Sequence, residues 1–344
     1  MNALERPARL TGSVDMTHGG GGRAMADLIR DLFQRHLSNA FLDQGNDAAL
    51  LPAETGRLVV STDGHVISPL FFPGGDIGSL SVHGTLNDVA MAGAKPLYLT
   101  AGFILEEGFP LADLERIVIS MATAAREAGV PIVTGDTKVV EKGKGDGVFI
   151  TTTGVGTVPD GVEISAKRVK PGQAVLISGS IGDHGVAILS KRENLEFETE
   201  IRSDSAALHT LVAAMVEAVP GIAMLRDPTR GGLSATLNEI AHAAQIGMKL
   251  DEAAIPLKPD VHAACELLGL DPLNVANEGK LICICEAGDA EKLLAVMRAH
   301  PKGADAAIIG HVVEDDACLI QMETGFGGAR VVDWLAGEQL PRIC

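Results

Sequence analysis

The apolar positions of the chain follow two patterns that alternate along its length. Apolar residues that recur every three or four positions predict amphipathic helices, and short runs rich in valine, isoleucine and leucine predict strands. Helices are predicted over residues 24–37, 74–93, 111–128, 205–219, 233–244, 259–268 and 288–300. Strands are predicted over residues 58–64, 98–104, 148–158, 174–178, 281–285, 306–313 and 317–322. Strands and helices alternate in both halves, which predicts an α/β or mixed α+β fold.

A change in composition near residues 159–161 divides the chain into two parts. We predict a leader at 1–13, an N-terminal domain at 14–160 and a C-terminal domain at 161–333. Residues 334–344 show no helix or strand period, so a mobile tail that ends in Cys344 is expected there. Two domains also agree with a length of 344 residues.

Composition narrows the class of protein. Hydrophobic residues make up 46% of the chain and aromatic residues only 3%, so the core must consist mainly of small aliphatic side chains. A formal net charge of −17 disfavours nucleic acid as a partner. No apolar run is long enough to span a membrane and no signal peptide opens the chain, so a cytoplasmic protein is expected. Five sparse cysteines argue against a disulfide framework.

Four aspartates occupy similar places in the predicted structure: Asp47, Asp63, Asp88 and Asp136. Three of them lie where an apolar strand or turn meets a loop, and Asp88 lies within a helix of small residues. The segment 131–138 is predicted to be a strand that breaks into a turn at Asp136 and Lys138. Mg²⁺ binds through a few carboxylates and leaves other positions to water and phosphate oxygens. Helix caps and solvated turns would explain the same acids, and both interpretations stay open.

A glycine run follows His18 and leads into the first predicted helix. Bare backbone N–H groups at the positive end of a helix suit a phosphate. A flexible lead-in is the alternative. The run is not a Walker A loop, because no Gly-Lys-Ser/Thr follows it.

The order of short motifs along the chain resembles one known family. The motifs are HGGGG, GNDAALL, STDG, GTLNDVAMAGAKP, GFILEEG, VTGDTKVV, GDHG, RDPTRGGL, ANEGKL and the terminal PRIC. From Val14 to Cys344 they resemble the HypE family of nickel–iron hydrogenase maturation factors. That family belongs to the ATP-binding superfamily of aminoimidazole ribonucleotide synthetase, thiamine-monophosphate kinase and selenophosphate synthetase.

The resemblance implies a two-domain fold of the aminoimidazole ribonucleotide synthetase type. The N-terminal domain would form a dimeric, β-barrel-like interface, and the C-terminal domain would be a layered α/β structure with a flexible tail. ATP and Mg²⁺ would bind in a cleft of the N-terminal domain. The implied metal ligands are Asp47, Asp63, Asp88 and Asp136. The implied ATP and phosphate ligands are His18, Gly19, Gly20, Asn87, Asp88, Thr137 and Arg230.

The resemblance also implies a reaction. A carbamoyltransferase, HypF, would place a carbamoyl group on Cys344 to give an S-carboxamide. ATP would phosphorylate the amide oxygen, and loss of protons and phosphate would leave a thiocyanate. The cyano group would pass to iron on the HypC–HypD complex. Lys138 would neutralise charge, and Glu278 would be the base if burial raises its pKa.

Other interpretations remain open for these residues. Lys138 could merely pair with Asp136, Glu278 could be an ordinary loop acid, and Arg230 could anchor its own loop. His184 and Asp227 are expected to be structural. The chain could instead be another ATP-dependent enzyme of the superfamily or a nucleotide-binding scaffold. No cysteine precedes Cys265, which argues against a selenophosphate synthetase.

Overall fold

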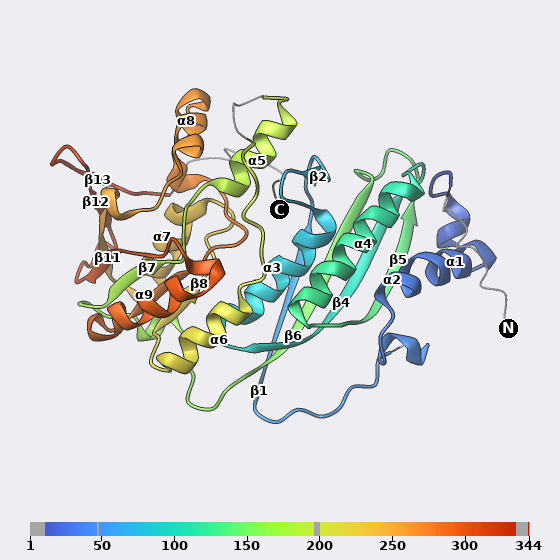
Figure 1. Ribbon diagram of the computed structural model, residues 1–344, viewed down its shortest axis with the longest axis horizontal. Helices are drawn as coiled ribbons and strands as arrows, with labels where there is room; N and C mark the ends of the chain where they lie inside the picture. Colours follow the sequence, from blue (N-terminus) through green and yellow to red (C-terminus); the bar gives the residue numbers. More distant parts are fainter. Residues whose placement is uncertain (1–10, 47, 196–199, 335–342, 344) are drawn as a thin grey trace.

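The computed structural model describes residues 11–46, 48–195, 200–334 and 343. Two β-sheets organise this part of the chain, one of four strands and one of seven, and a helix lies between them (Figure 1). The mixed α/β content that the sequence predicts is present.

The first sheet has the strand order β1-β6-β4-β5. Its strands are β1 (Arg57–His65), β4 (Lys95–Glu106), β5 (Ile132–Val140) and β6 (Val148–Val158). β4 and β5 run parallel because α4 (Leu111–Ala128) carries the chain back between them, and the other pairs are antiparallel. α4 and α3 (Ile77–Met91) cover one face of the sheet, which leaves the other face open. The short strands β2 (Phe71–Phe72) and β3 (Gly75–Asp76) precede α3.

Helix α3 is buried on nearly all sides because of its small residues. Asp76 caps it, since its carboxylate accepts hydrogen bonds from the N–H groups of Gly78 and Ser79. A Cβ atom at Gly78 would lie 2.2 Å from the carbonyl oxygen of Ile117 in α4, so only glycine allows the two helices to approach this closely. A helix that is apolar all round belongs inside a protein, and α3 is the central element of the molecule (Figure 1).

The N-terminal segment departs from the regular helix that the sequence predicts at 24–37. It contains η1 (Met16–Gly19), α1 (Arg23–Leu28), the π-helix η2 (Ile29–Gln34) and α2 (Arg35–Leu37), followed by η3 (Leu42–Gln44). Leu32 and Phe33 of the π-helical turn insert into the core of the first domain. The apolar residues fall at helical spacing in either conformation, so the pattern could not distinguish them.

The predicted turn at Asp136 and Lys138 is wrong. β5 continues through both residues to Val140 and pairs with β4 as far as Glu106. The reason is that β4 is long enough to supply partners to the whole segment. A Cβ atom at Gly135 would lie 2.3 Å from the carbonyl oxygen of Ala101, so this glycine serves close strand packing rather than a turn.

The second sheet has the order β13-β12-β9-β11-β7-β10-β8. Its strands are β7 (Ala174–Ile177), β8 (Met224–Arg226), β9 (Gly247–Asp251), β10 (Ile282–Cys285), β11 (Ala307–Val313), β12 (Ile320–Glu323) and β13 (Ala329–Val331). The helices are α5 (Asp183–Arg192), α6 (His209–Ala218), α7 (Gly232–Ala244), α8 (Pro259–Leu268) and α9 (Ala290–Ala299). Short 3₁₀ turns are η4 (Ala166–Arg168), η5 (Glu252–Ala254), η6 (Pro272–Asn274), η7 (Ala287–Asp289) and η8 (Pro301–Gly303).

Alternate residues of the central strand β7 face two different hydrophobic clusters. Leu176 packs with α6 and α9, and Val175 packs with α7 on the opposite face. The sequence patterns miss β8, β9 and β13, which have three to five residues each. Strands this short carry too few residues for a period to emerge, and pairing within the sheet decides their conformation.

The cluster on the α6 and α9 side continues into the first domain through Val89, Met91 and Val158. Asn87 adds a polar tie. Its amide nitrogen donates to the carbonyl oxygens of Ala206 (3.0 Å) and Glu278 (3.2 Å), and its oxygen accepts from the N–H of Leu208 (2.8 Å). The two domains therefore share a core, and this shared core fixes the geometry of any site between them.

Near the end of the chain, Ile343 is buried against the first domain and forms an isolated antiparallel bridge with Ile67. The predicted mobile tail otherwise lies outside the described residues, and so does Cys344. In the described part of the chain, no helix combines the length and the apolar character that crossing a bilayer requires.

Candidate functional site

A cavity of about 620 Å³ lies between the two domains. Its first-domain wall comes from β1 and α3, and its second-domain wall comes from β8, the loop that precedes α7, α7 itself and the loop before β10. It is lined by Ser61, Thr62, Asp63, Gly84, Asp88, Met91, Met224, Leu225, Arg226, Asp227, Thr229, Arg230, Thr236, Glu239 and Glu278. Three of the sequence-predicted acids and Arg230 meet here.

The position of Gly84 shows how closely two of the acids approach each other. A Cβ atom at Gly84 would lie 3.7 Å from Oδ2 of Asp63 and 3.9 Å from Oε2 of Glu278. Asp63 comes from a strand of the first domain and Glu278 from a loop of the second. Asp88, one turn further along α3, accepts a hydrogen bond of 2.8 Å from the hydroxyl of Ser61. Carboxylates that are far apart in sequence therefore face one small space.

The crowding changes the acidity of these groups. Burial raises the pKa of Asp88, while the Ser61 hydrogen bond opposes the shift and repulsion from Asp63 adds to it. Burial, with repulsion from Asp88, raises the pKa of Asp227 to about 7. The pKa of Glu278 lies well above its usual range because of burial and of repulsion from Asp227 and its neighbours. Each of these acids is thus a stronger base than an ordinary carboxylate.

Such a cluster is chemically suited to a divalent cation. Carboxylate oxygens are the protein ligands that Mg²⁺ prefers, and a cation would relieve the mutual repulsion of Asp63, Asp88, Asp227 and Glu278. Among the residues that the structure describes, no three His, Cys, Asp or Glu side chains form a group ready to hold a metal ion. Asp47, the fourth acid that the sequence suggests, lies outside the described residues.

Two arginines, Arg226 and Arg230, bring positive charge to the second-domain wall of the cavity. Arg226 forms an ion pair with Glu239 of α7, and Arg230 precedes the N-terminus of the same helix. Gly231, the N-cap residue of α7, has a left-handed φ of 73°. A Cβ atom at Gly232 would lie 2.6 Å from the carbonyl oxygens of Leu273 and Val275. The RDPTRGGL motif therefore combines an acid, two arginines and a tightly packed helix N-terminus, an arrangement that can bind phosphate.

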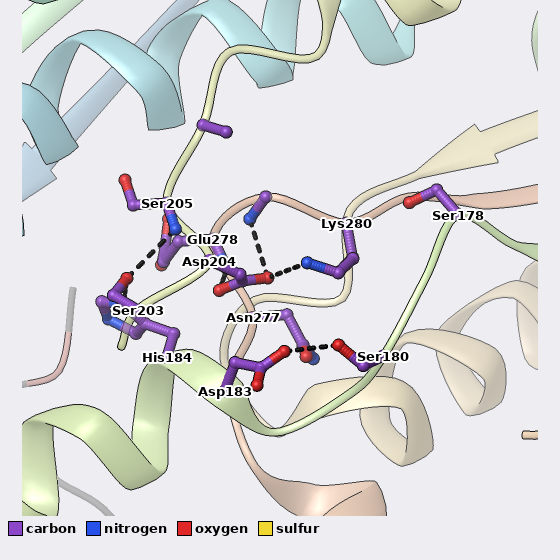
Figure 2. A network of polar contacts seen from close by, with 12 residues as sticks. Ser178, Ser180, Asp183, His184, Ser203, Asp204, Ser205, Asn277, Glu278 and Lys280 are labelled. Atoms are coloured by element: carbon purple, nitrogen blue, oxygen red, sulfur yellow. Dashed lines mark hydrogen bonds and ion pairs between the residues drawn. The ribbon is translucent and has the colours of Figure 1, made fainter. Parts of the chain in front are cut away.

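The loop that carries Glu278 is held by a buried ion pair (Figure 2). The carboxylate of Asp204 accepts from the N–H groups of Glu278 (3.1 Å) and Gly279 (3.2 Å) and from Nζ of Lys280 (3.0 Å). Burial alone would raise the pKa of Asp204, but Lys280 and His184 bring it below the usual range. A Cβ atom at Gly279 would lie 1.9 Å from the carbonyl oxygen of Asp204. The hydrogen bonds between Asp204 and this backbone thus fix the position of Glu278.

Asn277 connects the same loop to the other side of the cavity. Its oxygen accepts from the N–H of Gly182 (2.8 Å), and its nitrogen donates to the carbonyl oxygens of Pro228 (2.9 Å) and Val275 (3.1 Å). Pro228 follows Asp227, so one buried amide relates the two acids with the most strongly raised pKa values. Neither Asn277 nor Asp204 stands out in the sequence, because their roles depend on segments that meet only in the folded chain.

The structure does not bring Asn87 or Thr137 into this cavity. Asn87 uses its amide for the interdomain hydrogen bonds described above. The Thr137 side chain is buried on the inner face of β5. Both residues are expected phosphate ligands from the resemblance, and the structure gives each of them a different surrounding.

A second group of expected site residues lies at the far edge of the first sheet. Asp136 and Lys138 form an exposed ion pair of 2.8 Å on the open face of β5, and the pKa of Asp136 is lowered by Lys138. Because β6 and β4 separate β5 from β1, Asp136 lies about 14 Å from Asp63. Within one chain, Asp136 therefore does not meet Asp63 and Asp88.

The glycine run belongs to this second group. A Cβ atom at Gly19 would lie 2.9 Å from Cβ of Val139, so the run packs directly on β5. His18 caps the short turn, since its Nδ1 accepts from the N–H of Asp15 at 3.1 Å. Gly20 follows as the C-terminal residue of the same turn. The turn that holds His18, Gly19 and Gly20 thus lies against β5, away from Glu278.

Asp227 gives the site a pH-dependent stability. Its folded pKa of about 7 exceeds the unfolded value, so the folded protein binds more protons between about pH 4 and pH 7. Stability contributed by the protonated carboxyl is present below pH 4 and is lost as pH rises through 7. Asp227→Asn should therefore raise the free energy of unfolding at pH 8 by about 2 kcal/mol and change it little at pH 4. Urea denaturation at both pH values measures the difference, and an equal effect at both would contradict the assignment.

Comparison with known proteins identifies the class. The models of the N-terminal and C-terminal domains of AIR synthase related proteins match residues 45–158 and 170–322. Carbamoyl dehydratase HypE of Cupriavidus necator is 69% identical over 342 residues, which are 99% of this chain and 97% of that protein.

Two solved structures agree with this match. Hydrogenase maturation protein HypE in complex with ATP superposes with a TM-score of 0.92 at 53% identity, covering 96% of this chain and 99% of that chain. The HypE–HypF complex gives a TM-score of 0.79 at 50% identity, covering 90% and 99%. The chain therefore belongs to the AIR synthase related family and, within it, to the HypE carbamoyl dehydratases.

Proposed function

We propose that this chain uses ATP to dehydrate an S-carboxamide on Cys344 to a thiocyanate, which supplies the cyanide ligand of a nickel–iron hydrogenase. The observation that carries the proposal is Glu278, a buried acid of raised pKa in an interdomain cavity of carboxylates and arginines. Membership in a family with an ATP-bound structure supports the nucleotide.

The reaction divides into two steps whose atoms and charges balance. The amide oxygen of the carboxamide attacks the γ-phosphorus of ATP, ADP leaves, and the nitrogen loses one proton. The second step breaks the bond between carbon and the phosphorylated oxygen while the nitrogen loses its remaining proton, which leaves S–C≡N and phosphate. Phosphoryl transfer converts a poor leaving group into a good one and depends mainly on positioning and charge neutralisation.

Glu278 is the proposed acceptor for the protons of the amide nitrogen. A general base works best when its pKa lies near the working pH, and burial moves Glu278 in that direction. Asp204 and Asn87 hold its backbone, so the carboxylate is oriented before the substrate arrives. Arg230 and Arg226 stand where they can bind the phosphates and the leaving phosphate.

Mg²⁺ is the proposed metal, held by Asp63 and Asp88 with Asp227 beside them. When bound, it would neutralise the phosphate charge and the repulsion among the acids. Support comes from the carboxylate donor set and from the raised pKa values of Asp88 and Asp227, since a cation would offset both the burial and the mutual repulsion that raise them.

Cys344 remains the best candidate for the modified thiol. The other four cysteines, all in the described part of the chain, are buried. Burial raises the pKa of Cys265 to about 11, so its thiolate is scarce at neutral pH. A thiol needs access and thiolate character to react, and the chain terminus can provide the access.

A second copy of the chain is the proposed partner for the open face of the first sheet. Leu58 and Val60 of β1 are 63% and 65% exposed on that face, and Ile104 of β4 is exposed on the same face, with β6 between the two strands. A two-fold axis parallel to the strands would stack β1 of one copy on β5 of the other. Such a homodimer would bring Lys138 of the partner subunit and its glycine run toward the cavity, and would complete the expected metal and ATP set.

The proposed partners in the pathway follow from the two ends of the reaction. A carbamoyltransferase of the HypF type must load the thiol, and the crystallised HypE–HypF complex supports this partner. A HypC–HypD complex is the proposed acceptor of the cyano group.

The experiment that tests the function is intact mass spectrometry of the C-terminal peptide, combined with a phosphate assay. The protein is incubated with HypF, carbamoyl phosphate and Mg-ATP. Gain of one carboxamide, followed by loss of the elements of one water with release of one phosphate, is the expected result. A scaffold or another enzyme of the superfamily would release no phosphate tied to that mass loss.

Asp88→Asn tests the proposed metal and nucleotide site. The variant keeps the shape and the Ser61 hydrogen bond but removes one negative charge, so affinity for Mg-ATP should fall about tenfold or more. Isothermal titration calorimetry measures the affinity. Asp113→Asn, at an exposed position in the first turn of α4, is the matched control and should bind Mg-ATP unchanged. Undiminished affinity of Asp88→Asn would remove Asp88 from the site.

A further inference from the structure

Ile343, the penultimate residue of the chain, is buried and makes both apolar and polar contacts. Its side chain is 5% exposed and belongs to the hydrophobic core of the first domain. Its backbone pairs with Ile67, just beyond the end of β1. Its carbonyl oxygen accepts a hydrogen bond of 2.5 Å from Nε2 of His184. One apolar and two polar contacts thus hold a residue that neighbours the chain end.

The contacts of His184 fix the tautomer that donates this hydrogen bond. Its Nδ1 lies 2.8 Å from the hydroxyl of Ser203, and the ring contacts Phe72 edge-on with centroids 5.6 Å apart. A carbonyl can only accept, so Nε2 carries the proton and Nδ1 accepts from Ser203. Burial lowers the pKa of His184, which agrees with a neutral ring. From the sequence, His184 was expected to be structural.

The same segment that orients His184 also holds the loop of Glu278. The hydroxyl of Ser203 accepts from the N–H of Ser205 at 3.1 Å. Asp204, between them, accepts from the N–H groups of Glu278 and Gly279. Figure 2 shows His184, Ser203, Asp204 and Glu278 side by side along this path. Hydrogen bonds, together with the covalent backbone of segment 203–205, therefore join the docked residue to the backbone of the proposed base.

We propose that Ile67, His184 and Ser203 form a docking site for Ile343, and that segment 203–205 couples occupation of this site to the position of Glu278. The inference rests on the proposed function in its second part only. His184 and Ser203 are positioning residues, since they act through Ile343 and through the Glu278 loop.

The antiparallel direction of the Ile343–Ile67 bridge relates the docked residue to the strand that lines the cavity. Ile343 and Ile67 pair antiparallel, so the backbone at Ile343 runs opposite to β1 and points back along the line from Ile67 to His65 and Asp63. Asp63 is in the cavity wall. The docked residue Ile343 is therefore paired with the segment that directly follows β1, the strand that carries Asp63.

Hydrogen exchange of the full-length protein tests the docking itself. Ile343→Ala removes three buried methylene equivalents, each worth about fourfold in an equilibrium constant. Exchange of the amides at 66–68 should accelerate by about 60-fold in this variant and by only about fourfold in Ile343→Val, which loses one. Unchanged exchange in Ile343→Ala would overturn the docking site.

A second arm tests the coupling. Ser203→Ala removes the group that fixes the tautomer of His184 and should accelerate exchange both at 66–68 and in the Glu278 loop. Phosphate release from carbamoylated protein should slow in Ile343→Ala and recover in Ile343→Val, with Mg-ATP affinity unchanged in both. Faster exchange with undiminished phosphate release would overturn the coupling and leave the docking intact. Absence of phosphate release from the unaltered protein would reject the proposed function, while exchange would still decide the docking.

Discussion

Replacement of Glu278 with glutamine is expected to slow dehydration of the carbamoylated protein by about 100- to 10,000-fold, the usual contribution of a general base. Glutamine keeps the size of the side chain and cannot accept the proton of the amide nitrogen. Carbamoylation of Cys344 and binding of Mg-ATP should persist, because neither requires a base at this position. Single-turnover measurement of phosphate release and of the thiocyanate mass gives the rate.

Stability separates this effect from misfolding. Burial and repulsion from Asp227 raise the pKa of Glu278, so the folded protein retains this proton to higher pH than the unfolded chain does. The ionised acid therefore costs stability as pH rises, and the neutral glutamine should be at least as stable as glutamate at pH 8. Glu286→Gln makes the same chemical change at an exposed ion pair with Lys170 and should retain activity. Normal dehydration by Glu278→Gln would assign the base to another residue.

Replacement of Cys344 with alanine is expected to abolish the reaction completely. The proposed substrate is covalently attached to this sulfur, so no other group can substitute for it. The variant should bind Mg-ATP with unchanged affinity, because the cavity is built from residues far from the chain end in sequence. Intact mass spectrometry after incubation with HypF, carbamoyl phosphate and ATP should show no carboxamide adduct.

Cys265→Ala provides the matched control. Cys265 is buried in α8 with a raised pKa, so its loss should leave the adduct in full yield. An adduct of unchanged yield on Cys344→Ala would mean that one of the buried thiols becomes accessible and would contradict the assignment. The four buried cysteines make this outcome easy to map by digestion.

Periodicity located the long elements well and the short ones poorly. Helix α4 was predicted at 111–128 and found there, because its apolar stripe faces one sheet along its whole length. Strand β6 was likewise predicted at its observed bounds. The break at Asp136 was wrong, since exposed polar residues on an edge strand resemble a turn until the neighbouring strand is known. The π-helix at Ile29–Gln34 leaves no distinct mark in the sequence.

The candidate site shows the same division. The terminal cysteine, the glycine run and the spaced acids could be found in the sequence, because each is a local feature. Asp227 was expected to be structural, although it directly follows strand β8. The roles of Asp204 and His184 could not be predicted, because they come from contacts with Glu278 and Ile343, which are distant in the chain.

The sequence alone therefore determined the class of fold, the family and the residue types available for the chemistry, since these depend on composition, local pattern and motif. Only the tertiary structure decided which acids meet. Strand order separates Asp136 from Asp63 by two intervening strands, and the shared core of the two domains brings Glu278 to Asp63. The pKa values that make the cavity chemically useful arise from burial and from charges at short range, and neither exists before the chain is folded.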